Sequence, residues 1–277
     1  MDDFRYNLIN SRTTDLINMA VLEYNEEASK RLLAVYTTPD VEAQRQEFIN
    51  DINLQPDEKV LDVGSGPGFL ARIIKDKVGT QGLVYGVDVS EFMLNIAQSK
   101  SDEKDGIKFS YGDATDLQFP DESFDTITCT QVLEYLNDVD KALKEFNRVV
   151  RKVGKVALLD TDWDSIVWYS SNPERMRRVL KIWEAHASDP FLPRTLSSRM
   201  ERAGLQVIAQ KIFTIYNPSY KEETYSNRMI DLITTFVIEN GGIDKEEALA
   251  WANELRDGHE NSYFFSLNRY FFLGRKI

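Results

Sequence analysis

Short apolar runs alternate with amphipathic stretches through the middle of the chain. The runs are rich in Val, Ile, Leu and Phe, which predicts strands at 59–63, 83–88, 107–110, 124–129 and 154–160. Between them, apolar residues recur at helical spacing, and we expect helices at 68–77, 90–99 and 138–151. Such alternation predicts a parallel sheet with helices on both of its faces.

The segments on either side of this region have a different pattern. Residues 1–50 favour helices, the second of them at about 39–51 with Thr38 as its N-cap. After residue 160 the pattern favours four further helices, at 173–188, 194–203, 221–239 and 244–257, and two strands, at 205–216 and 262–275. We expect the last two strands to form an antiparallel hairpin at the edge of the sheet, with helices inserted between them. The apolar segment 229–237 should lie buried under a lid or in a dimer contact.

Composition narrows the range of partners. The chain has 277 residues and a formal net charge of −12, whereas binding to phosphates normally needs a basic surface, so we expect no nucleic-acid partner. No apolar run approaches the ~20 residues of a membrane span, and no secretory leader is visible. The single cysteine, Cys129, lies in an apolar strand, which favours a packing role, and its isolation favours a cytoplasmic location.

A glycine-rich turn follows the first predicted strand. Residues 60–68 are Val-Leu-Asp-Val-Gly-Ser-Gly-Pro-Gly, and Asp88 ends the second strand twenty residues after Gly68. Glycines permit a tight turn and a close approach of the backbone to a ligand. An acid at the end of the second strand can accept hydrogen bonds from two ribose hydroxyls.

Two further motifs follow in order. Gly112-Asp113-Ala114 comes after the third strand, and Thr130-Gln131-Val132-Leu133-Glu134-Tyr135 comes after the fourth. Together the four elements resemble the class I S-adenosylmethionine (SAM) methyltransferases, and within them the ubiquinone/menaquinone-biosynthesis type. Two departures preserve the turn chemistry: Lys152-Val153-Gly154-Lys155 replaces the family's usual Lys-Pro-Gly-Gly, and Ser65 replaces its common cysteine.

The resemblance implies a fold, a cofactor and a set of ligands. The fold is α/β, a Rossmann-like seven-stranded mixed sheet with a helical cap, and the cofactor is SAM, with S-adenosylhomocysteine as product. We expect a cap segment at 1–54, a cofactor-binding core at 55–160, and a segment at 161–277 that completes the sheet and adds cap inserts at about 161–195 and 217–260. The expected cofactor-binding residues are Gly64, Ser65, Gly66, Asp88, Val89, Met93, Gly112, Asp113, Ala114, Thr130 and Gln131.

Methyl transfer depends mainly on alignment and on exclusion of water, and it needs a general base only for some acceptors. The candidates for a base are His186 and Asp162, with His259, Asp160 and Asp164 as alternatives; structural roles as capping or surface residues remain open for them. Aromatic and basic residues near the strand ends could form the acceptor site, although core packing is the alternative for each aromatic: Trp163, Trp168, Phe191, Arg194 and Tyr263.

The sequence therefore favours methylation of O, N or C in a small, largely apolar or aromatic metabolite, without a metal. Two alternatives stay open, a SAM-binding protein of the same fold that transfers no methyl group and a methyltransferase acting on a macromolecule. A homodimer is compatible with the apolar segment 229–237.

Overall fold

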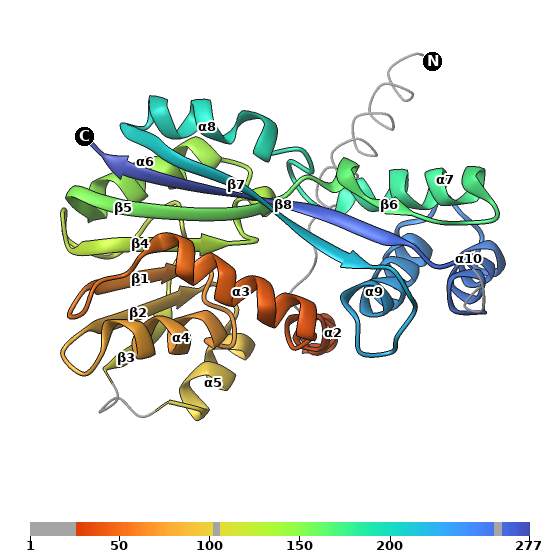
Figure 1. Ribbon diagram of the computed structural model, residues 1–277, viewed down its shortest axis with the longest axis horizontal. Helices are drawn as coiled ribbons and strands as arrows, with labels where there is room; N and C mark the ends of the chain where they lie inside the picture. Colours follow the sequence, from red (N-terminus) through yellow and green to blue (C-terminus); the bar gives the residue numbers. More distant parts are fainter. Residues whose placement is uncertain (1–25, 102–105, 258–261) are drawn as a thin grey trace, which may run out of the picture.

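The computed structural model describes residues 26–101, 106–257 and 262–277. Its centre is a mixed sheet in the order β3-β2-β1-β4-β5-β8-β6, and β7 pairs with the other edge of β8 (Figure 1). The strands are β1 (Lys59–Val63), β2 (Leu83–Asp88), β3 (Ile107–Tyr111), β4 (Phe124–Thr130), β5 (Val150–Thr161), β6 (Val167–Trp168), β7 (Leu205–Asn217) and β8 (Phe265–Lys276). β1 to β5 are parallel to one another, whereas β8 is antiparallel to its neighbours.

The helices lie close to the ranges that the sequence predicts. They are α2 (Glu26–Tyr36), α3 (Pro39–Ile52), α4 (Phe69–Val78), α5 (Glu91–Ser99), α6 (Val139–Val149), α7 (Pro173–Trp183), α8 (Pro193–Arg202), α9 (Tyr225–Asn240) and α10 (Lys245–Asp257). Short 3₁₀ turns follow β4, β5 and α7, at Leu133–Tyr135, Trp163–Ser165 and Glu184–His186. None of the helices in the described ranges is both long and apolar enough to cross a bilayer.

Successive side chains along the strands pack on opposite faces of the sheet, as strand geometry requires. Val60 and Phe271 belong to a buried cluster with residues of α3 and α4. Their neighbours Leu61 and Phe272 belong to a second cluster with residues of α6 and α8. Helices thus cover both faces, which confirms the layered α/β architecture predicted from the sequence.

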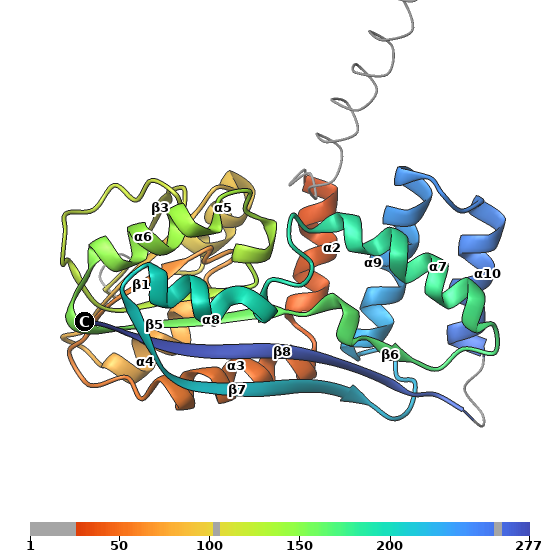
Figure 2. The same cartoon turned by 90° about the horizontal axis from the view of Figure 1, so that it is seen from above.

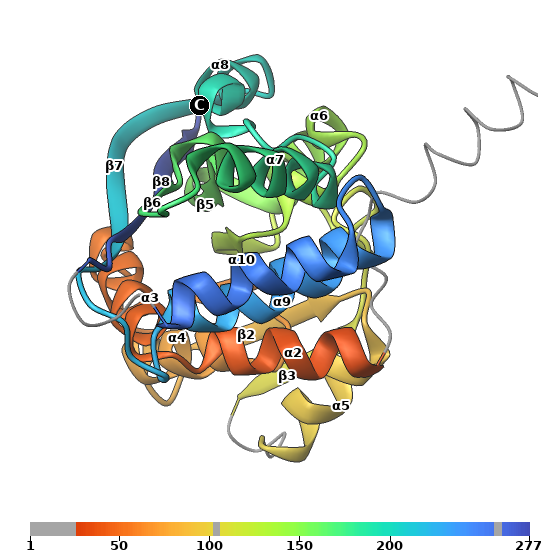
Figure 3. The same cartoon turned by 90° about the vertical axis from the view of Figure 1, so that its right-hand side faces the viewer.

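A helical cap lies beyond the carboxyl ends of the parallel strands. The long pair β7–β8 extends from the sheet toward α9 and α10 (Figures 1 and 2). In Figure 3, α9 and α10 lie in front, with α2 on one side and α7 on the other. The buried core of this cap includes Val179, Trp183, Ile230, Ile233, Phe236 and Trp251.

Two details differ from the sequence-based expectations and two confirm them. The seven predicted strands are present, and the structure adds β6, a two-residue strand that pairs with the start of β8. Thr38 precedes α3, but its hydroxyl donates to the Val35 carbonyl instead of capping the helix. The predicted burial of the segment 229–237 is confirmed, because α9 packs against α2, α7 and α10 of the same chain. Cys129 is fully buried, as a packing residue would be.

Candidate functional site

The glycine turn between β1 and α4 keeps its backbone open to the cavity above the strands. Gly64, Gly66 and Gly68 all have positive φ angles, of 71°, 50° and 76°. A Cβ atom on Gly64 would lie 2.1 Å from the side chain of Val132, whereas one on Gly66 would meet nothing within 4 Å. Gly64 is therefore required for packing, and the space beside Gly66 belongs to the cavity.

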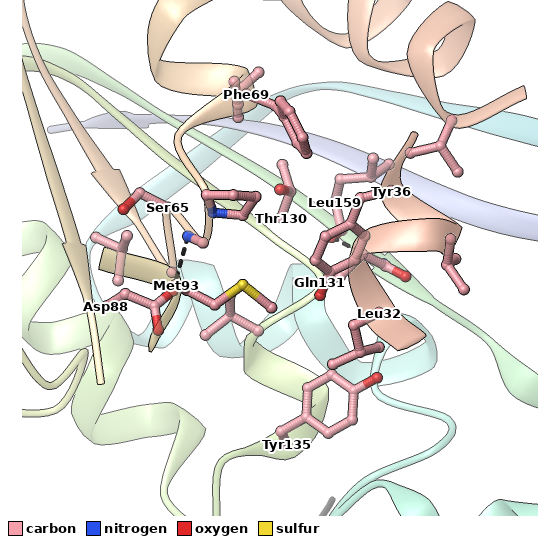
Figure 4. A pocket seen from close by; sticks show the side chains of 18 of the residues that line it. Leu32, Tyr36, Ser65, Phe69, Asp88, Met93, Thr130, Gln131, Tyr135 and Leu159 are labelled. Atoms are coloured by element: carbon pink, nitrogen blue, oxygen red, sulfur yellow. Dashed lines mark hydrogen bonds between the residues drawn. The ribbon is translucent and has the colours of Figure 1, made fainter. Parts of the chain in front are cut away.

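Asp88 ties this turn to the end of β2. Its Oδ2 accepts a hydrogen bond from the Gly66 amide at 2.8 Å (Figure 4), and its Oδ1 accepts one from the Ser90 amide at 2.8 Å. Partial burial raises the pKa of this carboxyl, while the backbone donors oppose the rise. Each carboxylate oxygen can accept more than one hydrogen bond, so both oxygens can still receive ligand hydroxyls.

A second acid, Asp62, lies beneath the turn. Its Oδ1 accepts a hydrogen bond from the Thr128 hydroxyl at 2.7 Å, but its buried Oδ2 has no partner in the described residues. Burial is the main cause that raises the pKa of Asp62 to about 7, and the charge of Asp88 adds to the shift. An unpartnered buried oxygen in a cavity wall is suited to a cationic ligand group.

The end of β4 closes the next side of the cavity. Gln131 has a φ of 56°, which is unusual for a residue other than glycine. Its amide donates to the Leu159 carbonyl at 2.7 Å, and its side-chain Oε1 accepts from the Thr161 hydroxyl at 2.6 Å. These bonds to β5 hold the strained turn in place.

All eleven residues expected to bind the cofactor line one cavity of about 340 Å³. This volume lies within the range of about 300–1,000 Å³ typical of small-molecule sites. In Figure 4, Asp88 and Ser65 lie on one side of this cavity, and Tyr36 and Leu32 lie on the opposite side. The structure thus brings these residues together, while their roles as ligands stay predictions.

The structure corrects the expectation that His186 reaches this cavity. The imidazole stacks on Trp183 with ring centres 3.8 Å apart, is fully buried, and lies behind the wall. Its Nδ1–H donates to the Trp183 carbonyl at 2.5 Å. Burial lowers the pKa of His186 to about 3, so the ring is neutral near pH 7. Its geometry fits packing in the cap, and the other candidate, His259, lies outside the described residues.

Asp162 is also directed away from the cavity. Its carboxylate accepts two hydrogen bonds from Arg194, at 2.7 and 2.9 Å, and one from the Asp164 amide at 3.2 Å. Arg194 is half exposed, and its guanidinium also lies 4.7 Å from the centre of the Phe191 ring. The buried Asp162 and the half-exposed Arg194 thus form a cluster outside the cavity lining, so neither Arg194 nor Phe191 lies where an acceptor site was expected. Asp160, an alternative base, is fully buried outside the cavity lining.

Of the five residues expected at an acceptor site, Trp163 alone lines the cavity. Trp168 packs in the cap core, against Phe265 and Trp251 at centroid distances of 4.7 and 5.6 Å. Tyr263 donates to the Ser226 hydroxyl at 2.8 Å and borders a separate, smaller cavity. The core-packing alternative therefore describes Trp168, and the expectation that it walls the main cavity is not met.

The far wall consists largely of residues that sequence reasoning missed. They come from α2, α3, the turn after β4, α9 and β8, and include Tyr36, Gln44, Arg45, Tyr135, Tyr225 and Arg269. The sequence did contain a signal for Arg269. Every second residue at the start of β8 is apolar, except at this position: Phe265, Leu267, Arg269, Phe271. A similar signal existed for Asp62, an acid within the apolar strand β1.

Comparison with known proteins agrees with this geometry. Residues 61–158 match the family model described as a methyltransferase domain. This segment is similar to methyltransferase domains. A demethylmenaquinone methyltransferase of Staphylococcus aureus (strain MRSA252) is 37% identical over 117 residues, which are 42% of this chain and 48% of that protein. The chain therefore spans about half the length of the curated relatives it matches.

Solved structures extend the likeness of the fold beyond the domain. The YcgJ protein of Bacillus subtilis superposes with a TM-score of 0.56 at 24% identity, covering 85% of this chain and 98% of that one. Phosphoethanolamine N-methyltransferase 2 of Haemonchus contortus, solved with phosphomonomethylethanolamine and S-adenosylhomocysteine, gives 0.58 at 16% identity and covers 92% and 58%. The predicted resemblance to SAM-dependent methyltransferases and the predicted class I fold are confirmed.

Proposed function

We propose that the protein uses SAM to methylate a small, largely apolar metabolite. The observation that supports this most strongly is a single cavity with two chemically different walls. One wall is the methyltransferase domain, with the glycine turn and Asp88, and the other is the cap, with aromatic and aliphatic side chains such as Trp163, Trp183, Met229 and Leu232.

The residues on the first wall fit the parts of the cofactor. Asp88 would accept hydrogen bonds from the two ribose hydroxyls, and Val89 and Met93 would pack on the adenine. Asp113 would accept from the adenine amino group. The unpartnered Oδ2 of Asp62 would receive the ammonium of the methionine part, and the open space at Gly66 would admit the backbone of the ligand.

When bound, the cofactor supplies a methyl group activated by its sulfonium sulfur. The chain's own contribution is to orient the acceptor and to exclude water, which α2, α9 and the turn after β4 would do by covering the strand ends. Segments 161–195 and 217–260 are part of this proposed cap. Neither His186 nor Asp162 lines the cavity, so neither would act as a base there. Burial raises the pKa of Tyr36, so its hydroxyl would stay protonated and would donate a hydrogen bond to the acceptor.

Incubation with methyl-labelled SAM and a metabolite extract tests this proposal. We expect label in a small product that partitions into organic solvent, and no label with the Asp88→Ala variant. Label in precipitated protein or nucleic acid would favour a macromolecular acceptor instead. Tight binding of S-adenosylhomocysteine without any transfer would favour a protein that binds the cofactor only. A cytoplasmic location and a homodimer stay predictions.

A further inference from the structure

Arg269 is a buried cation in the wall of the cavity. Arg269 pairs across the sheet with Thr161, the last residue of β5, and only 6% of its surface is exposed. The guanidinium has five N–H donors. Nη1 donates to the Gln44 side chain at 2.6 Å and Nη2 donates to the Tyr225 hydroxyl at 3.3 Å, while the buried Nε has no partner among the residues that the structure describes.

No carboxylate forms an ion pair with this arginine within the described residues. None of their carboxylate oxygens lies within the ion-pair distance of 4.0 Å from Arg269. The nearby carboxyl of Glu134 is buried behind the wall, where its Oε2 accepts from the Thr161 amide at 2.9 Å. Burial raises the pKa of Glu134 to about 7, while the hydrogen bond from the Thr161 amide and the charge of Arg269 act in the opposite direction, so Glu134 is only a partial counterion near neutral pH.

A buried charge without a partner is strongly unfavourable, even in a protein as acidic as this one. The neighbours that touch Arg269 are a neutral amide and a tyrosine ring, whose centre lies 5.1 Å from the guanidinium carbon. A second arginine, Arg45, also lines the cavity and adds positive charge. The electrostatics of this wall therefore favour an anion from outside the chain.

The two arginines belong to the same wall but contact different neighbours. Arg45 lies over the ring of Phe69, the first residue of α4 after the glycine turn, with 5.2 Å between guanidinium carbon and ring centre. Arg269 instead contacts Tyr225, the first residue of α9 in the cap. Arg45 is thus the arginine nearer to the proposed cofactor wall, and Arg269 the one nearer to the acceptor wall.

We propose that Arg269 binds a carboxylate of the methyl acceptor, so that the substrate is a small organic acid with an apolar body. The Nε–H and the remaining N–H groups can meet both oxygens of a carboxylate, the geometry for which arginine is suited. The apolar body would lie against Trp163, Trp183, Met229 and Leu232. This inference rests on the proposed function and adds the chemical class of the acceptor.

Calorimetry with a pair of probes tests it. 2-Naphthoate and the uncharged 2-naphthylmethanol are titrated into protein saturated with S-adenosylhomocysteine. We expect the wild type to bind the carboxylate at least tenfold more tightly than the alcohol, and Arg269→Met to lose that preference. The affinity of Arg269→Met for S-adenosylhomocysteine should change less than threefold. Arg275→Met, an exposed site on the same strand, is the matched control and should keep both properties.

Three results would overturn the proposal. They are equal affinity of the wild type for both probes, an unchanged preference in Arg269→Met, and a loss of S-adenosylhomocysteine binding in that variant of tenfold or more, which would assign Arg269 to the cofactor. If Arg269→Met does not fold, Arg269→Lys keeps the charge but not the planar fork and should still lose at least fivefold of the preference. Failure of the proposed function would differ from all of these, because the wild type would either not bind S-adenosylhomocysteine or transfer no label from SAM to a small product in the incubation described above.

Discussion

Replacing Asp88 by alanine tests the proposed ribose contact. In the structure each carboxylate oxygen already accepts one backbone N–H at 2.8 Å, from Gly66 and from Ser90, and retains capacity for a second donor. Two ligand hydroxyls on a charged acceptor should together contribute about 2–4 kcal/mol. Asp88→Ala should therefore weaken binding of S-adenosylhomocysteine roughly 30- to 900-fold.

Asparagine separates charge from shape at this position. Asp88→Asn keeps one acceptor oxygen, but its amide group would face one of the two backbone N–H donors as a second donor. We expect an affinity between those of the wild type and Asp88→Ala. Titration calorimetry measures all three proteins, and urea unfolding reports how much the loss of the two backbone bonds destabilises the fold.

A matched control distinguishes the contact from a loosened helix. The Ser90 hydroxyl caps α5 by accepting from the Met93 amide at 3.3 Å, and Ser90 does not line the cavity. Ser90→Ala should lower the free energy of unfolding by about 0.5–2 kcal/mol and leave the affinity unchanged. Unchanged affinity in Asp88→Ala, or an equal loss in Ser90→Ala, would refute the assignment of Asp88 to the ribose.

Three further predictions concern the turn, Asp62 and His186. Gly66→Ala and Gly79→Ala both place a Cβ in open space at positive φ. Both should destabilise the fold, by about 1–3 kcal/mol each, but Gly66→Ala alone should weaken S-adenosylhomocysteine binding, by about 1–3 kcal/mol. Equal affinities of the two variants in calorimetry would contradict this. Because the pKa of Asp62 is about 7 and an ammonium ligand favours its ionised form, binding at pH 6 should release close to ~1 proton, and Asp62→Asn should abolish the release. Calorimetry in buffers of different ionisation enthalpy measures this, and an unchanged release in the variant would exclude Asp62. The pKa of His186 falls from 6.5 to about 3 on folding, so the unfolded chain binds more protons and stability is lost as the pH falls below about 6.5. Urea unfolding at pH 7 and pH 5 should show a smaller loss for His186→Phe, and equal losses would contradict a buried neutral histidine.

The cofactor side of the cavity could be predicted because it depends on local rules. Parallel strands present their carboxyl ends at one edge of the sheet, so motifs that follow β1, β2, β3 and β4 must meet there. The positive φ angles of Gly64 and Gly66 show why glycine occupies these positions in the sequence. Spacing along the chain was therefore sufficient to bring eleven residues to one cavity.

The expectations for His186, Asp162 and Trp168 failed for a different reason. Each lies close in sequence to the end of β5 or to the cap, but sequence proximity does not fix the direction of a side chain. Asp162 turns toward Arg194, thirty-two positions away, and His186 is held behind Trp183 by stacking. Such directions are decided by packing between elements, which hydrophobic spacing alone does not reveal.

The same distinction applies to Arg269, the residue proposed to bind the acceptor. The alternation of β8 places Phe265, Leu267, Arg269 and Phe271 on buried positions, and three of these four are apolar. The strand pairs with β5 in the sheet from Arg269 onward, while its first residues pair with β6 beside the cap. Arg269 thus lies where β8 passes from its pairing with β6 beside the cap to its pairing with β5 in the sheet. A charged residue that interrupts an apolar alternation in this way can be recognised in a sequence as a signal of function. The signal is informative when the neighbouring strand end is already known to line a ligand cavity.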